Sequence, residues 1–186
     1  MDIKRTNDLE AARLKCLVYG EAGAGKTRLC STVPDPTKAL ILSAEAGLLS
    51  LRDFELDYVQ ISSIEDLKGV YRHLLENDHY EWVMLDSISE IAETCLAAEK
   101  ANSKDPRKAY GEMADRMFKL LRSFRDLDLH VYMSAKLSRV EDNGRQMFGP
   151  SLPGKQLSQG IAYLFDEVFV LHVNRDENGQ LSRVLQ

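Results

Sequence analysis

The chain has 186 residues, of which 44% are hydrophobic, and this suits one α/β domain with its own core. No apolar run approaches the roughly 20 residues of a membrane span, and no signal-peptide core follows the first residues, so we expect neither a membrane nor a secreted protein. Three widely separated cysteines without zinc-ligand spacing favour buried thiols in a reduced, cytoplasmic protein.

The net charge of −5 argues against broad nucleic-acid binding, but the charge is unevenly distributed. Residues 100–125 contain eight basic and three acidic side chains, and residues 136–155 contain four basic and two acidic ones. The rest of the chain is therefore strongly acidic. A polarised molecule of this kind can still present a local basic surface.

Residues 1–13 are polar and are expected to form an arm or a disordered lead before a core that spans residues 14–186. In the core, short continuously apolar runs alternate with amphipathic segments, as in buried parallel strands and their covering helices. The expected elements, in chain order, are strand 15–19, helix 26–32, strand 39–43, strand 56–61, helix 64–76, strand 82–85, helix 87–100, helix 109–127, strand 130–133, helix 157–165, strand 167–173 and strand 181–185.

Two segments, 101–108 and 138–160, are polar or rich in Gly and Pro, and we expect both to be loops. Asn178-Gly179 predicts a hairpin turn between the last two strands. The alternation of strands and helices predicts an α/β fold: a doubly wound, mostly parallel sheet flanked by helices, with a C-terminal antiparallel hairpin. Because Gln186 falls within the last expected strand, we expect the core to be incomplete at its carboxyl end.

Residues 20–27 read Gly-Glu-Ala-Gly-Ala-Gly-Lys-Thr and match the phosphate-binding loop pattern G-x-x-x-x-G-K-[ST]. Such a loop turns several backbone N–H groups toward one point and cradles a polyphosphate. Lys26 supplies a charge for the β- and γ-phosphates, and Thr27 supplies a hydroxyl for Mg²⁺. We therefore predict a nucleoside triphosphate and Mg²⁺ as ligands, with nucleotide contacts from Gly20, Glu21, Ala22, Gly23, Ala24, Gly25, Lys26, Thr27 and Arg28.

Acidic residues follow two of the expected strands. Asp86 ends the apolar run 82–85, at the sheet edge that also carries the phosphate loop, and with Thr27 it would hold the metal. The alternative is that Asp86 only caps the next helix. Glu45 follows strand 39–43 and is the candidate base that orients the attacking water, unless it is a solvated loop acid. Glu90 is a weaker candidate for the same role.

Strand 130–133 runs into Ser134 and Lys136, which could sense the γ-phosphate, although Lys136 could also be an ordinary surface lysine. The loops expected at 101–110 and 138–156 are basic, and each carries an aromatic residue. Cations combined with stacking aromatics hold single strands without sequence preference, whereas the alternative is ordinary solvated charge. The candidate DNA contacts are Lys104, Arg107, Lys108, Arg139, Arg145, Phe148 and Lys155.

Several of these segments resemble the RecA-type ATPase core and its replicative-helicase relatives. The carriers are the phosphate loop, Ser43-Ala44-Glu45, Val83-Met84-Leu85-Asp86-Ser87, and Ser134-Ala135-Lys136-Leu137-Ser138-Arg139. More closely, residues 14–186 resemble the short, phage-encoded ATP-binding proteins that are reduced to a RecA core and grouped with single-strand annealing recombinases. This closer match is carried by residues 109–112, 121–127, 149–155 and 165–168.

The resemblance implies ATP hydrolysis coupled to single-stranded DNA, annealing of complementary strands, assembly into rings or filaments, and work beside a single-strand-binding protein in the host cytoplasm. It also implies catalytic roles for Lys26, Glu45 and Asp86. The chain departs from the pattern at Lys136, where relatives often have a glutamine that couples the γ-phosphate to the DNA loop. Relatives also reach into a neighbouring subunit's site with a cation, for which Arg183 is the nearby candidate.

Two other functions stay open. The chain could be a nucleotide-switched protein that assembles or loads a partner without contacting DNA, which its acidity and the absent glutamine favour. A small-molecule kinase is a weaker alternative, because the sequence lacks the arginine cluster that such enzymes carry on a lid.

Overall fold

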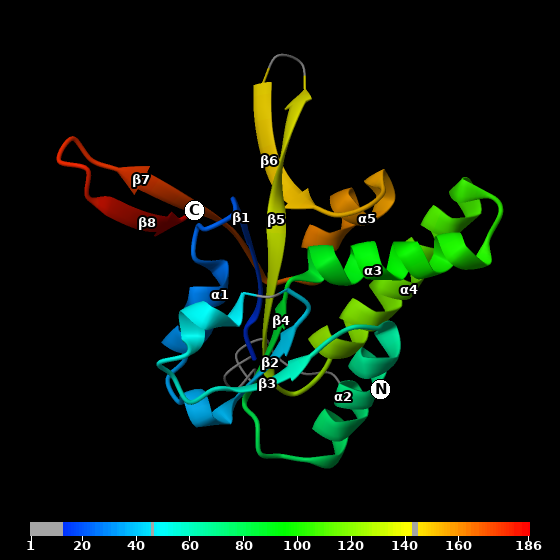
Figure 1. The fold of residues 1–186 in the computed structure, drawn as a ribbon, viewed down its shortest axis with the longest axis horizontal. Coiled ribbons are helices and arrows are strands. Elements are labelled where there is room, and N and C mark those ends of the chain that lie inside the picture. The colour runs from blue at the N-terminus through cyan, green and yellow to red at the C-terminus, as the bar shows by residue number, and fades with distance from the viewer. Residues whose placement is uncertain (1–12, 46, 143–144) are drawn as a thin grey trace, which may run out of the picture.

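A computed structural model describes residues 13–45, 47–142 and 145–186, and the side chains of residues 140–146 are not described. Within these residues, eight strands form one sheet in the order β3-β2-β4-β5-β1-β7-β8, and β6 pairs with β5 (Figure 1). The strands are β1 (Lys15–Gly20), β2 (Ala39–Ser43), β3 (Asp57–Gln60), β4 (Trp82–Asp86), β5 (His130–Asp142), β6 (Arg145–Ser151), β7 (Glu167–Arg175) and β8 (Leu181–Leu185).

The strand directions confirm the predicted α/β class. All pairs from β3 across to β7 are parallel, whereas β5–β6 and β7–β8 are antiparallel hairpins. The turn of the last hairpin contains Gly179 with a φ of 79°, as Asn178-Gly179 predicts. Of the arm predicted at residues 1–13, residues 1–12 lie outside the described residues.

Helices cover both faces of the sheet, which explains why the central strands are apolar without alternation. One hydrophobic cluster lies beneath the helical segments within residues 64–164, and a second lies beneath those within residues 26–51. The helical elements are α1 (Lys26–Leu29), η2 (Cys30–Thr32), η3 (Pro36–Lys38), η4 (Leu48–Leu51), α2 (Ile64–Glu76), α3 (Ile88–Asn102), α4 (Pro106–Arg125), α5 (Lys155–Gly160) and η5 (Ile161–Leu164). Among the described residues, none of these helices combines the length and apolarity needed to span a bilayer.

Local capping sets where the long helices begin. Ser63 and Asp66 form a reciprocal capping box at the start of α2. Ser87 accepts a hydrogen bond from the Glu90 amide at the start of α3. Asp105 caps α4, whose first residue is Pro106, a position where a proline costs no hydrogen bond.

The structure corrects both predicted loops. The segment 101–108 is mostly helical, because α3 continues to Asn102 and α4 begins at Pro106, which leaves a turn at residues 103–105. The segment 138–160 is not a long loop. Its first part is a β-hairpin, because β5 continues to Asp142 and pairs with β6, and its second part is α5.

The hairpin stands out from the body of the sheet in Figure 1. Its glycine and proline content concealed it, but β6 is an edge strand, where a proline such as Pro150 removes no central ladder hydrogen bond. The cross-strand hydrogen bonds satisfy a polar backbone that local composition alone assigns to a loop.

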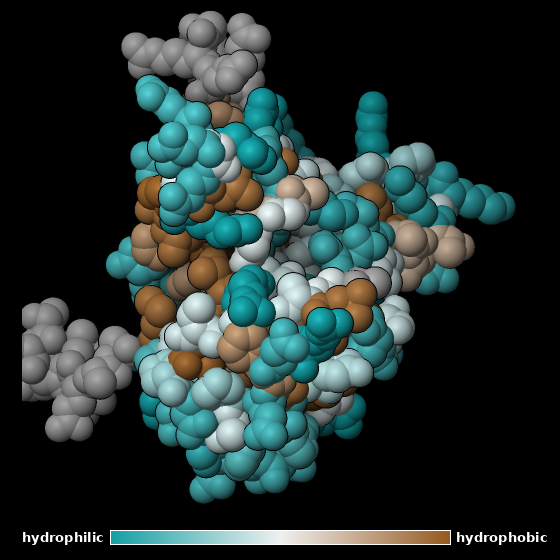
Figure 2. All heavy atoms as spheres, turned by 60° about the vertical axis from the view of Figure 1, so that its left-hand side comes forward, coloured by the Kyte–Doolittle hydropathy of each residue, from teal (hydrophilic) through white to brown (hydrophobic). Residues whose placement is uncertain are grey.

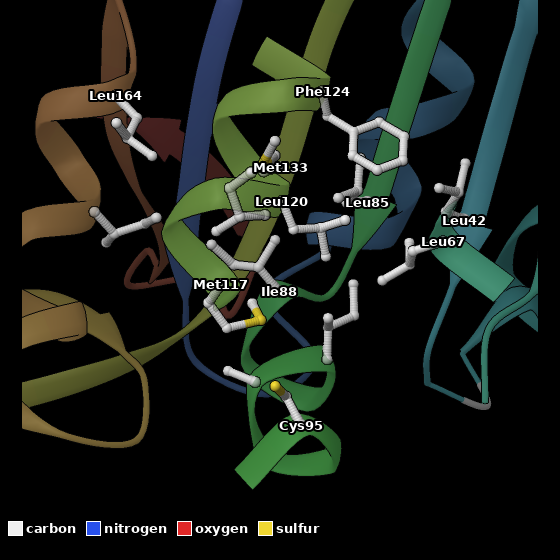
Figure 3. Packing of buried hydrophobic residues seen from close by; sticks show 14 of the residues in the cluster. Leu42, Leu67, Leu85, Ile88, Cys95, Met117, Leu120, Phe124, Met133 and Leu164 are labelled. Carbon is white, nitrogen blue, oxygen red and sulfur yellow. The ribbon is translucent and has the colours of Figure 1, made fainter. Parts of the chain in front are cut away.

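The larger core lies between β4, β5, α3 and α4, and Figure 3 shows its side chains converging. Phe124 is fully buried and contacts the Tyr71 ring edge-on, with the ring centroids 5.6 Å apart. The three cysteines are buried and free, as expected. Burial raises the pKa of the Cys16 thiol to about 11, which keeps it protonated and unreactive at neutral pH.

We expect Phe124→Ala to lower the free energy of unfolding by about 3–5 kcal/mol, because the substitution leaves a cavity in this core. Leu75→Ala, on the exposed side of α2, is the matched control and should change stability by less than about 0.5 kcal/mol. Urea denaturation of both variants measures the difference. Equal effects at the two positions would contradict the assigned core.

Candidate nucleotide-binding site

The phosphate loop connects β1 to α1 at the carboxyl edge of the sheet. Gly23 and Gly25 have φ angles of 74° and 107°, which residues with a side chain rarely adopt. Gly20 is required for a different reason: a Cβ there would approach the Leu171 carbonyl oxygen of β7 to 2.8 Å. The glycines therefore shape the loop and let it pack closely against the neighbouring strand.

Lys26 bends back over this loop. Its Nζ donates hydrogen bonds to the carbonyl oxygens of Gly20 and Glu21, at 3.0 Å each. Burial lowers the pKa of Lys26, while the nearby Glu45 and Asp86 carboxylates act in the opposite direction. The ammonium is thus held at the loop, where phosphate oxygens could replace the carbonyl oxygens as its acceptors.

Asp86 lies at the end of β4 with 2% of its surface exposed. Its Oδ2 accepts a hydrogen bond from Thr27 Oγ1 at 2.7 Å, and its Oδ1 accepts one from Ser134 Oγ. The residue that caps α3 is Ser87, so the alternative that Asp86 serves only as a helix cap is wrong. The structure brings the two predicted metal ligands, Thr27 and Asp86, into direct contact.

Glu45 follows β2 and lies beside these residues. The parallel pairing of β2 with β4 sets Ser43 opposite Asp86, and the next residue, Ala44, donates its amide to the Asp86 carbonyl oxygen at 2.8 Å. The half-buried Glu45 carboxylate accepts a hydrogen bond from Ser87 Oγ at 2.5 Å. It is therefore an anchored acid and not a freely solvated one, and its role as the base stays a prediction.

The two predicted phosphate sensors have different surroundings. Ser134 points to Asp86, whereas Lys136 Nζ forms ion pairs with Glu90 and Glu93 of α3, each at 3.0 Å. Partial burial works against the charged form of Lys136, but the hydrogen bonds with Glu93 and Glu90 prevail and raise its pKa. Glu90, the weaker candidate base, is thus a partner of Lys136. The sensor roles stay predictions.

A family model described as an AAA domain matches residues 12–186 of the chain. The chain belongs to this AAA domain family. A comparison of the chain with curated proteins found no match. Because the family is one of P-loop ATPases, it supports nucleotide binding and hydrolysis at the loop just described.

Two side chains at the phosphate loop of the AAA domain are suitable ligands for Mg²⁺. A hydroxyl and a carboxylate, from Thr27 and Asp86, are the hard oxygen ligands that this ion prefers. In the described part of the chain, no group of three or more His, Cys, Asp or Glu side chains could hold a metal. Phosphate oxygens and water would therefore complete the coordination, as is usual for Mg²⁺ at nucleotide sites. A bound Mg²⁺ would neutralise phosphate charge.

The candidate DNA residues of the AAA domain form two groups. Lys104, Arg107 and Lys108 are exposed at the turn from α3 to α4. Lys155 begins α5 next to Gly154, where a Cβ would come within 3.3 Å of the Tyr110 ring of α4. The first turns of α4 and the start of α5 are therefore neighbours, which the sequence did not reveal.

The second group lies on the β5–β6 hairpin. Arg139 and Phe148 are cross-strand partners, and the guanidinium carbon lies 5.8 Å from the ring centroid. The side chain of Arg145, also on β6, lies outside the described residues.

The structure also reveals contacts to the loop that the sequence reasoning missed. Tyr132 of β5 donates its hydroxyl to the Lys26 carbonyl oxygen at 2.8 Å. Arg139 forms an ion pair with Glu21, the second residue of the loop. Arg183 of β8, considered above as a cation for a neighbouring subunit, donates its Nε to the Ala24 carbonyl oxygen of its own chain at 2.9 Å. No local motif marks these residues, because their partners are distant in sequence.

We expect Lys26→Ala to abolish measurable ATP binding or hydrolysis, because the loop loses the cation that faces the β- and γ-phosphates. Lys119→Ala, which removes an exposed lysine of α4, is the control and should behave like the wild type. Binding of a fluorescent ATP analogue and phosphate release measure the two steps. Wild-type hydrolysis by Lys26→Ala would overturn the site assignment.

Glu45→Gln should bind ATP but hydrolyse it at least about tenfold more slowly, because the amide cannot accept a proton from the attacking water. The control is Glu55→Gln, an exposed position before β3. Single-turnover hydrolysis with saturating enzyme separates the chemical step from binding. An unchanged rate would show that another group serves as the base.

Proposed function

We propose that this AAA domain is a Mg²⁺-dependent ATPase whose hydrolysis is coupled to single-stranded DNA binding, and that it promotes annealing of complementary strands in recombination. We further propose that it acts in the cytoplasm as a ring or filament of identical subunits. The observation that carries the DNA proposal is that β5 runs from the nucleotide site into the hairpin. One strand supplies Ser134, bonded to the buried Asp86, and five residues later supplies Arg139, which lies over Phe148. A shift of β5 at the nucleotide site would therefore move the base of the hairpin.

The helix α3 offers a second connection between the two regions. It begins directly after Asp86 and Ser87 and ends at the α3–α4 turn with its exposed cations. At this turn Lys100 Nζ lies 5.1 Å from the centroid of the Tyr110 ring, and Tyr110 is 38% exposed. A cationic surface with an accessible aromatic ring fits a single strand, whose phosphates and bases it can contact together. This supports the α3–α4 turn as part of the DNA surface.

A second candidate function is a nucleotide-switched protein that assembles or loads a partner. The observation that favours it is the ion-pairing of Lys136 with Glu90 and Glu93, which directs this ammonium to α3. Coupling between the γ-phosphate and the hairpin would then not pass through Lys136. The net charge of −5 also favours a protein partner.

Steady-state ATP hydrolysis with and without single-stranded DNA distinguishes the two functions. We expect stimulation by DNA, because the two sites share β5 and α3. Lys26→Ala serves as the control for contaminating ATPases. Hydrolysis that is indifferent to DNA, together with no DNA binding, would favour the partner-loading function.

Neutralising Lys104, Arg107 and Lys108 to Gln should weaken single-stranded DNA binding and reduce its salt dependence, because fewer counterions are released per bound strand. The matched control neutralises three basic residues elsewhere, Lys38, Lys68 and Arg72. Fluorescence anisotropy at several salt concentrations measures both quantities. Equal affinities and equal salt slopes for the two triple variants would exclude the α3–α4 turn as a DNA contact.

A further inference from the structure

An ion pair joins the phosphate loop to the hairpin. Glu21 Oε1 accepts from Arg139 Nη2 across 118 positions of sequence. Both side chains are exposed to a similar degree, 62% for Glu21 and 60% for Arg139. An ion pair exposed to this degree is weakly held, because water competes for both partners. It is therefore a contact that another anion can replace.

Packing holds Arg139 at this position independently of Glu21. Its guanidinium lies over the Phe148 ring, and that ring contacts His172 of β7 edge-on with the centroids 5.9 Å apart. Tyr19 of β1 donates its hydroxyl to the Phe148 carbonyl oxygen at 3.4 Å. The base of the hairpin is thus tied to β1 and β7, and the Phe148 ring gives the Arg139 guanidinium a contact that does not involve Glu21.

The loop, the hairpin and β7 also border a partly open pocket of about 360 Å³. Glu21, Arg139, Phe148 and His172 line it together with the loop backbone. Figure 2, which brings the side of α1 and the β7–β8 hairpin forward, shows hydrophobic residues gathered in patches between hydrophilic ones on this side of the molecule. An anion that enters the pocket meets a guanidinium whose present partner is a carboxylate.

We propose that Glu21 is an internal competitor of nucleic-acid phosphate for Arg139. This inference rests on the proposed binding of single-stranded DNA by the hairpin. A carboxylate and a phosphodiester offer the guanidinium the same kind of oxygen acceptors and both carry negative charge, so they compete for one arginine. Glu21 thereby lowers the affinity of the hairpin for DNA, and it does so from within the phosphate loop.

The test measures the affinity for a fluorescently labelled oligothymidylate by anisotropy in Glu21→Gln, Arg139→Gln and the double variant. Glu21→Gln should bind about two- to fivefold more tightly than the wild type, the range expected for loss of one exposed competing ion pair. Arg139→Gln should bind more weakly, and the double variant should match Arg139→Gln. Glu21→Ala removes the same carboxylate and should show the same gain as Glu21→Gln.

Glu177→Gln is the matched control, because it removes an exposed glutamate from the turn between β7 and β8. Equal gains in DNA affinity for Glu21→Gln and Glu177→Gln would show that the effect comes from the change in net charge, and would overturn the proposal. A gain that persists in the Arg139→Gln background would also overturn it. If the wild type binds DNA and Arg139→Gln binds equally well, the proposal fails while the DNA function stands. If neither the wild type nor any variant binds, the DNA function fails with it.

Discussion

Asp86 is the residue on which the arrangement of the nucleotide site depends, because a nearly buried carboxylate is stable only when donors surround it. Thr27 and Ser134 donate to its two oxygens, and its backbone carbonyl accepts the amide of Ala44. These partners come from the phosphate loop, β5 and the segment after β2. Through its carboxylate and its backbone carbonyl together, Asp86 therefore aligns three segments of the chain, including the one that carries Glu45.

Parallel register makes this convergence possible. In a parallel sheet all carboxyl ends lie on one edge, and here β1, β2, β4 and β5 are parallel, so the segments that follow them meet there. Helices on both faces bury the strands and hold the register, while Gly20 lets the loop lie against β7. The β5–β6 hairpin then extends the central strand beyond this edge, which connects the nucleotide site to a surface at some distance from it.

The basic residues described above divide into those that are paired with carboxylates and those that are exposed at the α3–α4 turn. Lys136 and Arg139 are engaged by carboxylates of α3 and of the phosphate loop, respectively. Lys104 and Arg107, at the α3–α4 turn, are exposed. Exposed cations attract a polyanion over a distance of about a Debye length, whereas paired cations must first exchange partners. If the proposed DNA function holds, a strand would encounter the α3–α4 turn readily and the hairpin only in competition with the protein's own acids.

The sequence by itself determined most strands, most helices, the phosphate loop and the position of Asp86 at the end of β4, because each follows from a periodicity or a motif within about twenty residues. The tertiary structure decided the rest. The β5–β6 hairpin depends on cross-strand pairing that its glycine and proline content concealed. The partners of Lys136, Glu45 and Arg139 lie between 42 and 118 positions away. Such contacts depend on which strands become neighbours and in what register, and no local pattern in the chain encodes that choice.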